Sequence, residues 1–318
     1  MDKRLCSLNG VFAVLKPAGE SSAKTVDRVK KSLIRAALGE KVNPEQQHYK
    51  RFSRQIKVGH GGTLDPMATG VLVIGLNGGC KILAKYLSGP KSYCAQARFG
   101  EHYDTLDCTG KLLQRDEKWK EALEKKTCDD LQKLCDEKFV GEAIMQVPPA
   151  FSAIHVDGKR AYELARSEQT TSNVENSNLE SSCDQKEQSS NVETPKEQVD
   201  SLETPCDSES IKYSVITPQR EAASFQLAAR PVAIYSLSVQ CEPEGLPDFS
   251  LQVSCGGGCY IRSLIRDFSA ELGTLAHMTA LERTKQGIFT PEMCLKSDSE
   301  WSNLDSVEEA INRANSLL

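Results

Sequence analysis

Residues 59–70 read Gly-His-Gly-Gly-Thr-Leu-Asp-Pro-Met-Ala-Thr-Gly and lead directly into the apolar run Val-Leu-Val-Ile-Gly-Leu at residues 71–76. Glycine favours backbone angles that other residues avoid, and proline lacks an amide donor, so this composition predicts a shaped loop rather than a helix or a strand. The apolar run is typical of a short buried strand. Asp65 is therefore expected in a loop that a core strand holds still, either as a functional carboxylate or as a residue that caps its own turn.

The size and composition of the chain limit the classes of protein to which it can belong. With 318 residues, 39% of them hydrophobic, it can bury a substantial core as one large domain or two small ones. It contains no apolar run of about 18 residues, and its N-terminal segment lacks the apolar core of a secretory signal. We therefore expect an intracellular protein of the nucleus, the cytoplasm or both, with mitochondria left open and no membrane partner.

Twelve cysteines are spread along the chain from Cys6 to Cys294. Cys255 and Cys259 bracket three glycines, but a zinc site needs four ligands and no second pair has metal-ligand spacing. Reduced thiols and no bound metal are expected.

The charge of the chain is unevenly distributed. Residues 167–210 contain eleven acidic and two basic residues, so the overall net charge of -5 leaves about +4 on the rest. That balance permits an RNA partner. The same segment is almost empty of aromatic residues and cannot offset the entropy cost of ordering, so we expect a disordered acidic insert, with the fold resuming near Thr217.

Apolar periodicity predicts the regular elements. Strands are expected at residues 11–15, 71–76, 92–99, 233–239 and 249–255. Helices are expected from a cap at Ser21 or Ser22 to Ala37, at residues 119–138 in two pieces with Thr127 capping the second, at residues 260–272, and at residues 305–317 with Asp305 and Glu308 as a capping box.

Two groups of basic residues stand before the glycine-rich loop. Lys24, Arg28, Lys31 and Arg35 lie off the apolar face of the first helix, where a merely solvated face would also put them. The polar segment at residues 39–58 adds Lys50, Arg51, Arg54 and Lys57. A basic segment that enters a candidate site indicates contacts with phosphate groups.

Several common kinds of active site are excluded because the sequence lacks their motifs. The glycine-rich loop has no lysine where a P-loop needs one, the five histidines show no helical two-histidine motif, and no Gly-x-Ser-x-Gly elbow occurs. What is left is one aspartate in a rigid loop, Tyr93 at a strand start, and Arg262 after a glycine turn.

These pieces form a set that resembles the TruB family of pseudouridine synthases. Residues 59–70 are similar to the family's catalytic motif, and five further motifs follow its order: Lys16-Pro17, Lys91-Ser92-Tyr93, the segment 148–166, Tyr260-Ile261-Arg262 and Leu281-Glu282-Arg283. The resemblance covers roughly residues 9–283 apart from the insert. It implies an α+β pseudouridine synthase fold, a mixed, mostly antiparallel central sheet flanked by helices, with one catalytic domain at 9–318 interrupted by the insert at 167–210.

The same resemblance implies an activity. The expected reaction isomerises the uridine at position 55, in the TΨC loop of tRNA, to pseudouridine, without a cofactor or a metal, in a monomeric enzyme that binds the T arm. Messenger RNA hairpins that imitate the T arm are left open as further substrates. The target base must be flipped out of its stack. Asp65 could attack a carbon or take a proton, and both routes stay open.

Site roles follow from the matched motif positions. Asp65, Tyr93 and Arg262 are implied as catalytic: Arg262 would pair with Asp65 and fix its rotamer, and Tyr93 would stack on the base and assist removal of the proton from carbon 5. His60, Tyr260, Leu281 and Lys16 are implied as substrate-binding. The competing interpretations are a surface position for Arg262, a plain sheet aromatic for Tyr93, packing for His60, Tyr260 and Leu281, and support of the loop for Lys16.

Two other functions compete with the stand-alone enzyme. One is an RNA-binding chaperone that folds tRNA by holding the T arm without chemistry. The other is a guided pseudouridine synthase of small nucleolar ribonucleoproteins, which needs a C-terminal RNA-binding (PUA) domain. Only about 35 residues follow Arg283, so we expect no separate domain of that kind.

Overall fold

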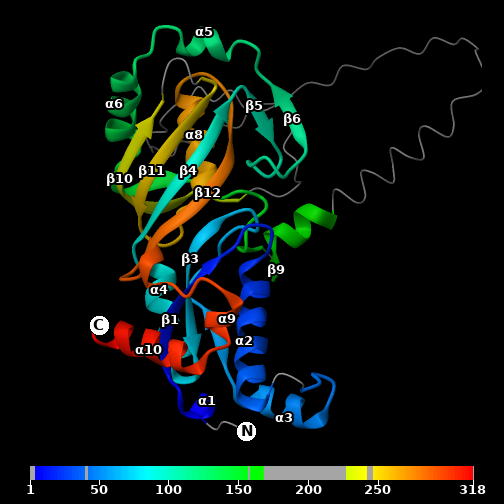
Figure 1. The fold of residues 1–318 in the computed structure, drawn as a ribbon. Helices are drawn as coiled ribbons and strands as arrows, with labels where there is room; N and C mark the ends of the chain where they lie inside the picture. Colours follow the sequence, from blue (N-terminus) through cyan, green and yellow to red (C-terminus); the bar gives the residue numbers. More distant parts are fainter. Residues whose placement is uncertain (1–3, 40–41, 157, 168–226, 242–245, 318) are drawn as a thin grey trace, which may run out of the picture. The chain divides into compact units, whose positions relative to one another are not determined.

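The computed structural model describes residues 4–39, 42–156, 158–167, 227–241 and 246–317. The chain divides into two compact units, one formed by Met1–Pro149 with Gln226–Leu318 and the other by Ala150–Phe225. Figure 1 shows both units as ribbons.

The larger unit is built on one mixed sheet, in the order β1-β3-β12-β4-β11-β10-β7, with β2 pairing beside β3. Its strands are β1 (Gly10–Lys16), β2 (Val58–His60), β3 (Thr69–Leu76), β4 (Lys91–Phe99), β7 (Gly141–Gln146), β10 (Arg230–Gln240), β11 (Asp248–Cys255) and β12 (Ala276–Gln286). All of these pairs are antiparallel except β12 with β3. The predicted mixed, mostly antiparallel sheet is confirmed, and all five predicted strands lie within it.

Strand β12 had no clean signal in the sequence. Its register against β4 shifts between Met278 and Ala280 and again between Arg283 and Lys285. Each shift breaks the period-2 alternation by which a strand is predicted, because an extra residue sends the following side chains to the other face. Strand β4 has no such break, and Tyr93, Ala95, Ala97 and Phe99 are all buried on one face, as predicted.

Helices cover both faces of the strand pair β1–β3. Phe12 and Val14 pack in one cluster with α2 (Ser22–Leu38), α9 (Asp298–Trp301) and α10 (Leu304–Asn315), whereas the alternate residues Val11 and Ala13 pack with α4 (Leu83–Ser88). The other half of the sheet shares a third cluster with α6 (Cys128–Lys138) and α8 (Ile261–Glu271). The predicted flanking of the sheet by helices is therefore confirmed (Figure 1).

Shorter elements complete this unit. They are α1 (Arg4–Ser7), α3 (Gln47–Gln55), the 3-10 helices η1 (Asn77–Ile82) and η3 (Pro291–Met293), α5 (Trp119–Leu123), and the hairpin of β5 (Glu101–Tyr103) with β6 (Leu112–Arg115). None of them was predicted as a separate element except α5, the first of the two pieces expected at residues 119–138.

The helix caps test the sequence signals directly. Ser21 caps α2 by accepting from the Lys24 amide, and Thr127 caps α6, both as expected. The Thr127 cap is a capping box with Asp130, which was not predicted from the sequence. The predicted capping box of Asp305 with Glu308 is wrong. Asn303 is the N-cap of α10, because its Oδ1 accepts from the amides of Asp305 and Ser306 at 2.9 Å and 3.2 Å.

The smaller unit is described from residue 150 to residue 167 apart from residue 157. Strands β8 (His155–Val156) and β9 (Lys159–Arg160) form a two-stranded antiparallel sheet, and residues 161–167 are helical. Ser167, which was expected to open the insert, is therefore part of a helical turn. The rest of the predicted insert and Thr217 lie outside the described residues.

The expectations of reduced cysteines and of no membrane-spanning segment can be compared with the described residues. The ten cysteines in it all carry free thiols. Across the same residues, no helix has the length and apolar character that a membrane crossing demands.

Candidate active site

Asp65 lies in the aspartate loop, which we define as residues 61–68 between β2 and β3. The two strands pair antiparallel, with Val58 opposite Leu76 and His60 opposite Ile74, so both ends of the loop are fixed to the sheet. Gly61 has no room for a side chain, since a Cβ there would lie 2.6 Å from the Cβ of Tyr86. Gly62 has a φ of +143°, which side-chain-bearing residues rarely adopt.

Two buried side chains, Lys16 from β1 and Ser22 from the start of α2, hold the backbone of the aspartate loop. The Lys16 Nζ donates to the carbonyls of Pro66 and Ala68 at 3.1 Å and 2.6 Å, and also to Pro17 at 2.8 Å. The Ser22 hydroxyl donates to the Leu64 carbonyl at 3.0 Å and accepts from its amide at 2.8 Å. Together these bonds fix both residues that flank Asp65.

Strand β12 holds the first residues of the same loop and the strand that follows it. The Arg283 Nη2 donates to the Gly62 carbonyl at 3.2 Å and its Nε to the Val71 carbonyl at 2.7 Å. The Gln286 Nε2 donates to the Gly61 carbonyl at 2.7 Å. Arg283 is fully buried, so its side chain is part of the core that shapes the loop.

Arg262 forms a two-point ion pair with Asp65. Its Nε donates to Asp65 Oδ2 at 2.8 Å and its Nη2 to Asp65 Oδ1 at 3.1 Å. The Arg262 side chain is only 5% exposed, whereas the Asp65 side chain is 29% exposed. Arg262 is thus no surface residue, and it turns a partly open carboxylate to a fixed orientation.

The loop between β5 and β6 completes the surroundings of Arg262. The Arg262 Nη1 donates to the Thr105 carbonyl at 2.7 Å, and the Arg262 Nε lies 3.8 Å from Asp107 Oδ2. Asp107 is buried, and its Oδ1 accepts from the Thr105 hydroxyl and the Thr109 amide, each at 2.9 Å. The sequence of residues 104–110 is typical of a turn and does not reveal this role, because a carboxylate that binds its own turn shows the same local pattern.

Tyr93 lies on β4, opposite Arg283 of β12 and Val253 of β11. It is 8% exposed, and it shares its apolar cluster with Leu64 and Ala68 of the aspartate loop. Burial raises the pKa of Tyr93 to about 12, although the neighbouring Arg283 guanidinium lowers it. The phenol therefore keeps its proton at neutral pH.

Two candidate substrate-binding residues have defined contacts. His60 is half-buried at the end of β2, its Nδ1 accepts from the Gly62 amide at 3.3 Å, and burial lowers the pKa of its ring. The Tyr260 backbone at the start of α8 is fixed by Gln146, whose Nε2 donates to its carbonyl at 3.0 Å and whose Oε1 accepts from its amide at 2.8 Å.

The other two candidates are buried. Leu281 is 7% exposed and packs in the same cluster as Tyr93, so it can form an apolar wall. Lys16 is 1% exposed and its ammonium faces three carbonyls, which is the support of the loop that competed with substrate binding. Desolvation lowers the pKa of Lys16 to about 8, against the opposing effects of Glu20 and Asp65.

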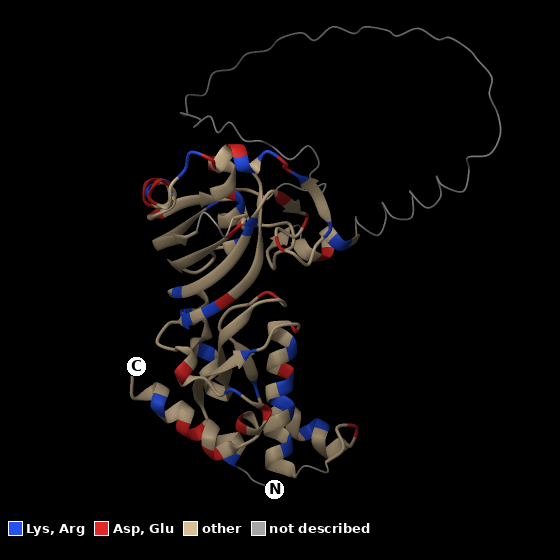
Figure 2. Ribbon diagram, turned by 45° about the horizontal axis from the view of Figure 1, so that its top comes forward, with Lys and Arg blue, Asp and Glu red and all other residues tan. Residues whose placement is uncertain are grey.

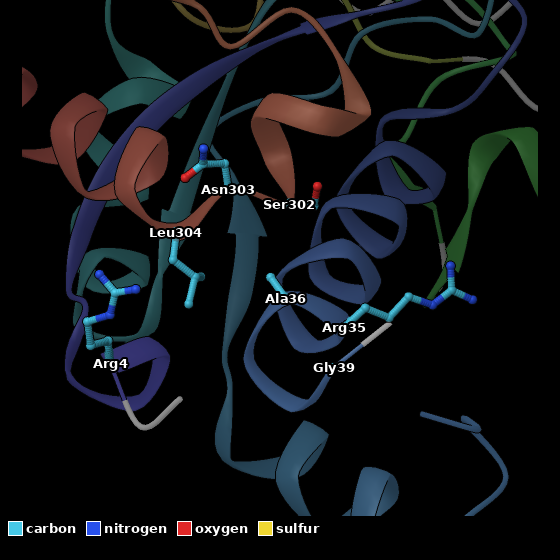
Figure 3. Close-up of a pocket in the computed structure, with 7 residues that line it drawn as sticks. All are labelled: Arg4, Arg35, Ala36, Gly39, Ser302, Asn303 and Leu304. Atoms are coloured by element: carbon cyan, nitrogen blue, oxygen red, sulfur yellow. The ribbon is translucent and has the colours of Figure 1, made fainter. Parts of the chain in front are cut away.

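An open pocket lies away from these residues, at the N-terminus of α10. Figure 3 shows its lining, which consists of Arg4, Arg35, Ala36, Gly39, Ser302, Asn303 and Leu304. None of the predicted site residues contributes to it.

Comparison with solved structures identifies the class of fold. The chain superposes on a chain of the crystal structure of a Cbf5-Nop10-Gar1 complex with a TM-score of 0.50 and 20% identity. The match covers 97% of this chain and 60% of the other. This is the pseudouridine synthase fold, in the form that the sequence predicted.

Comparison with known sequences then gives the family. Residues 50–180 match the model of the TruB family pseudouridylate synthase N-terminal domain. Human pseudouridylate synthase TRUB1 is 35% identical over 99% of this chain and 71% of its own length. The tRNA pseudouridine synthase B of Mycobacteroides abscessus is 33% identical (88% of this chain, 68% of its own), and tRNA pseudouridine synthase 4 of Schizosaccharomyces pombe is 30% identical (88% and 79%). The chain belongs to the TruB family of pseudouridylate synthases and is an isomerase.

Proposed function

We propose that the chain is a tRNA pseudouridine synthase that acts on the uridine at position 55 in the TΨC loop. The observation that carries the proposal is the Asp65 carboxylate, held by Arg262 through both of its oxygens in a loop with a fixed backbone. The relatives named tRNA pseudouridine synthase B and tRNA pseudouridine synthase 4 support tRNA as the substrate. T-arm-like hairpins of messenger RNA are a second substrate class that the same site would accept.

The reaction is an isomerisation that needs no net supply of atoms. The bond from the ribose C1′ to N1 of uracil breaks, the base turns, C1′ bonds to C5, and the C5 proton is lost while N1 gains one. The Asp65 carboxylate either attacks the ribose or removes a proton. Arg262 leaves it one orientation for that step.

Tyr93 and Leu281 suit the base that has been flipped out. Unstacking costs a few kcal/mol, and an aromatic ring with an apolar wall returns part of that cost through new contacts. Because the pKa of Tyr93 is raised to about 12, its oxygen must first give up its own proton before it can take one from C5.

The test uses an unmodified tRNA transcript and mapping of pseudouridine. We expect the wild-type protein to modify position 55 and the Asp65→Asn variant to give no product, because the amide can neither attack nor accept a proton. Asp129→Asn, an exposed change on α6, is the matched control. Absence of product from the wild-type protein would contradict the proposed function, and full activity of Asp65→Asn would contradict the role of Asp65.

The same variant separates the enzyme from the chaperone. If Asp65→Asn accelerates tRNA folding as well as the wild-type protein does, holding the T arm is an additional activity of the chain. A guided mode of action has no supporting observation in the described residues. A monomer in the nucleus or cytoplasm completes the proposal, and size-exclusion chromatography with cell fractionation tests it.

A further inference from the structure

Helix α2 carries a stripe of basic side chains along its outer face. Lys24, Arg28, Lys31 and Arg35 recur at i, i+4, i+7 and i+11, which places them on one side of a helix. The opposite side is the one that α2 buries, through residues such as Val29 and Leu33. Arg28 is engaged at the edge of the stripe, by Glu20 and Asp298 and by the ring of Trp301.

Helix α3 continues this arrangement. It buries Tyr49 and Phe52, and it exposes Lys50, Arg51 and Arg54. We call the exposed basic residues of the two helices the basic face: Lys24, Lys31, Arg35, Lys50, Arg51 and Arg54. Figure 2 shows basic positions recurring along α2 and on α3.

The basic face differs from an ordinary solvated helix surface because its two helices contain far more basic than acidic residues. Helices α2 and α3 contain eight basic residues and one acidic residue, Asp27, which pairs with Lys31 at 2.6 Å. By contrast, α6 and α10 contain seven acidic and three basic residues. Solubility alone is served by mixed charges, so this segregation within one unit of the chain indicates a polyanionic partner.

The basic face begins at the aspartate loop. Ser22, the first residue of α2, binds the backbone of Leu64 beside Asp65, and Lys24 follows two residues later. The 17 residues of α2 then run about 25 Å away from the loop, at 1.5 Å per residue, before α3 begins. The helices therefore form a positively charged track that starts at the site and leads away from it.

We propose that the basic face binds phosphate groups of the RNA substrate outside the loop that enters the site, with α3 contacting the RNA farthest from the target uridine. This inference rests on the proposed function, because it requires that the partner at Asp65 is RNA. On α3 the lysine and arginine side chains are exposed, whereas Tyr49 and Phe52 are buried. Exposed basic side chains suit phosphate contacts, which position an RNA without reading its bases.

The experiment combines the changes Lys50→Gln, Arg51→Gln and Arg54→Gln and measures kcat and KM at several salt concentrations. On a full tRNA transcript we expect an unchanged kcat and a KM that rises about tenfold, with a slope of log KM against log salt that falls by about 2. A short T-arm hairpin lacks the RNA that we propose lies on α3, so its KM should change less than about twofold. An unchanged KM and slope on the full tRNA would overturn the proposal.

Two further variants separate charge from folding. The exchange Lys50→Arg, Arg51→Lys and Arg54→Lys keeps the charge and should keep the wild-type KM and slope. The changes Lys118→Gln, Lys125→Gln and Lys126→Gln remove the same charge beside α5 and should leave both quantities unaltered. A loss in the charge-preserving exchange equal to that of the glutamine variant would assign the effect to helix packing and overturn the proposal. Product formation by the wild-type protein reports on the proposed function independently.

Discussion

Arg262 is the residue on which the site depends most. Its guanidinium joins Asp65 of the aspartate loop to Thr105 and Asp107 of the β5–β6 loop, two segments that share no sequence signal. A lysine has a single nitrogen and cannot donate in two parallel directions to one carboxylate. The planar fork of arginine is therefore what sets the direction of the Asp65 carboxylate.

The change Arg262→Lys tests this directly. Positive charge is kept beside Asp107, so the protein should fold, but the two-point contact with Asp65 is lost. We expect kcat to fall by about 100-fold or more while the Kd for tRNA changes less than about threefold. Single-turnover kinetics and a filter-binding assay give the two quantities. Equal losses in kcat and affinity would instead make Arg262 a phosphate contact.

The burial of Tyr93 leads us to expect that the stability of the fold depends on pH in the alkaline range. Its pKa is raised from 10.0 to about 12 in the folded protein, so the unfolded chain releases this proton first as the pH rises. The stability associated with the buried phenol is fully present below pH 10 and is lost between about pH 10 and pH 12, by roughly 3 kcal/mol. The Tyr93→Phe variant should lack this part of the alkaline loss in urea unfolding. Parallel stability curves for both proteins between pH 9 and pH 12 would show that the phenol is not buried.

The aspartate loop is best understood at the scale of elements. Side chains from three elements bind the backbone of the aspartate loop. They are Lys16 of β1, Ser22 of α2, and Arg283 and Gln286 of β12. Each of these side chains is buried and donates to one or more carbonyl oxygens of the loop. These hydrogen bonds tie the backbone of the loop to the elements around it.

The change Lys16→Met keeps the length and the apolar stem of the side chain but removes its three hydrogen bonds. Carbonyls of Pro17, Pro66 and Ala68 would lose that donor in a buried place, so we expect a stability loss of about 2–4 kcal/mol together with a lower kcat. Thermal unfolding and turnover are measured beside the exposed control Lys133→Met. A variant with normal stability and a raised KM alone would show that Lys16 binds the substrate.

At the scale of the whole molecule, charge is divided between segments of the sequence. Residues 168–210 contain eleven acidic and two basic residues. Deletion of this segment would therefore change the net charge of the protein from -5 to about +4. We expect the shortened protein to bind tRNA more tightly at low salt, with the difference shrinking as salt increases. Affinities measured at about 50 and 200 mM salt check this, and equal affinity of both proteins at low salt would contradict it.

Much of this fold and part of its site could be predicted from local pattern. The buried strand after the glycine-rich loop, the alternation around Tyr93 and the cap at Thr127 each depend on neighbours within a few residues, and all three are found. The contacts of Asp107 and Ser22 could not be predicted. Their side chains reach elements that are distant in sequence, and a turn or a helix start explains both residues equally well.

The sequence by itself determined that Asp65 lies in a shaped, glycine-rich loop ahead of a core strand, and that Tyr93 and Arg262 follow in the order of a pseudouridine synthase. Only the tertiary structure decided that Arg262 holds both oxygens of Asp65, that Lys16 supports the loop, and that Arg283 underlies it. The physical reason is that Lys16, Arg262 and Arg283 come from elements far from the loop in sequence. Strand pairing sets Lys16 of β1 and Arg283 of β12 opposite Gly70 of β3, and Arg262 comes from α8. Hydrogen bonds across such a pairing leave no periodic trace in either segment.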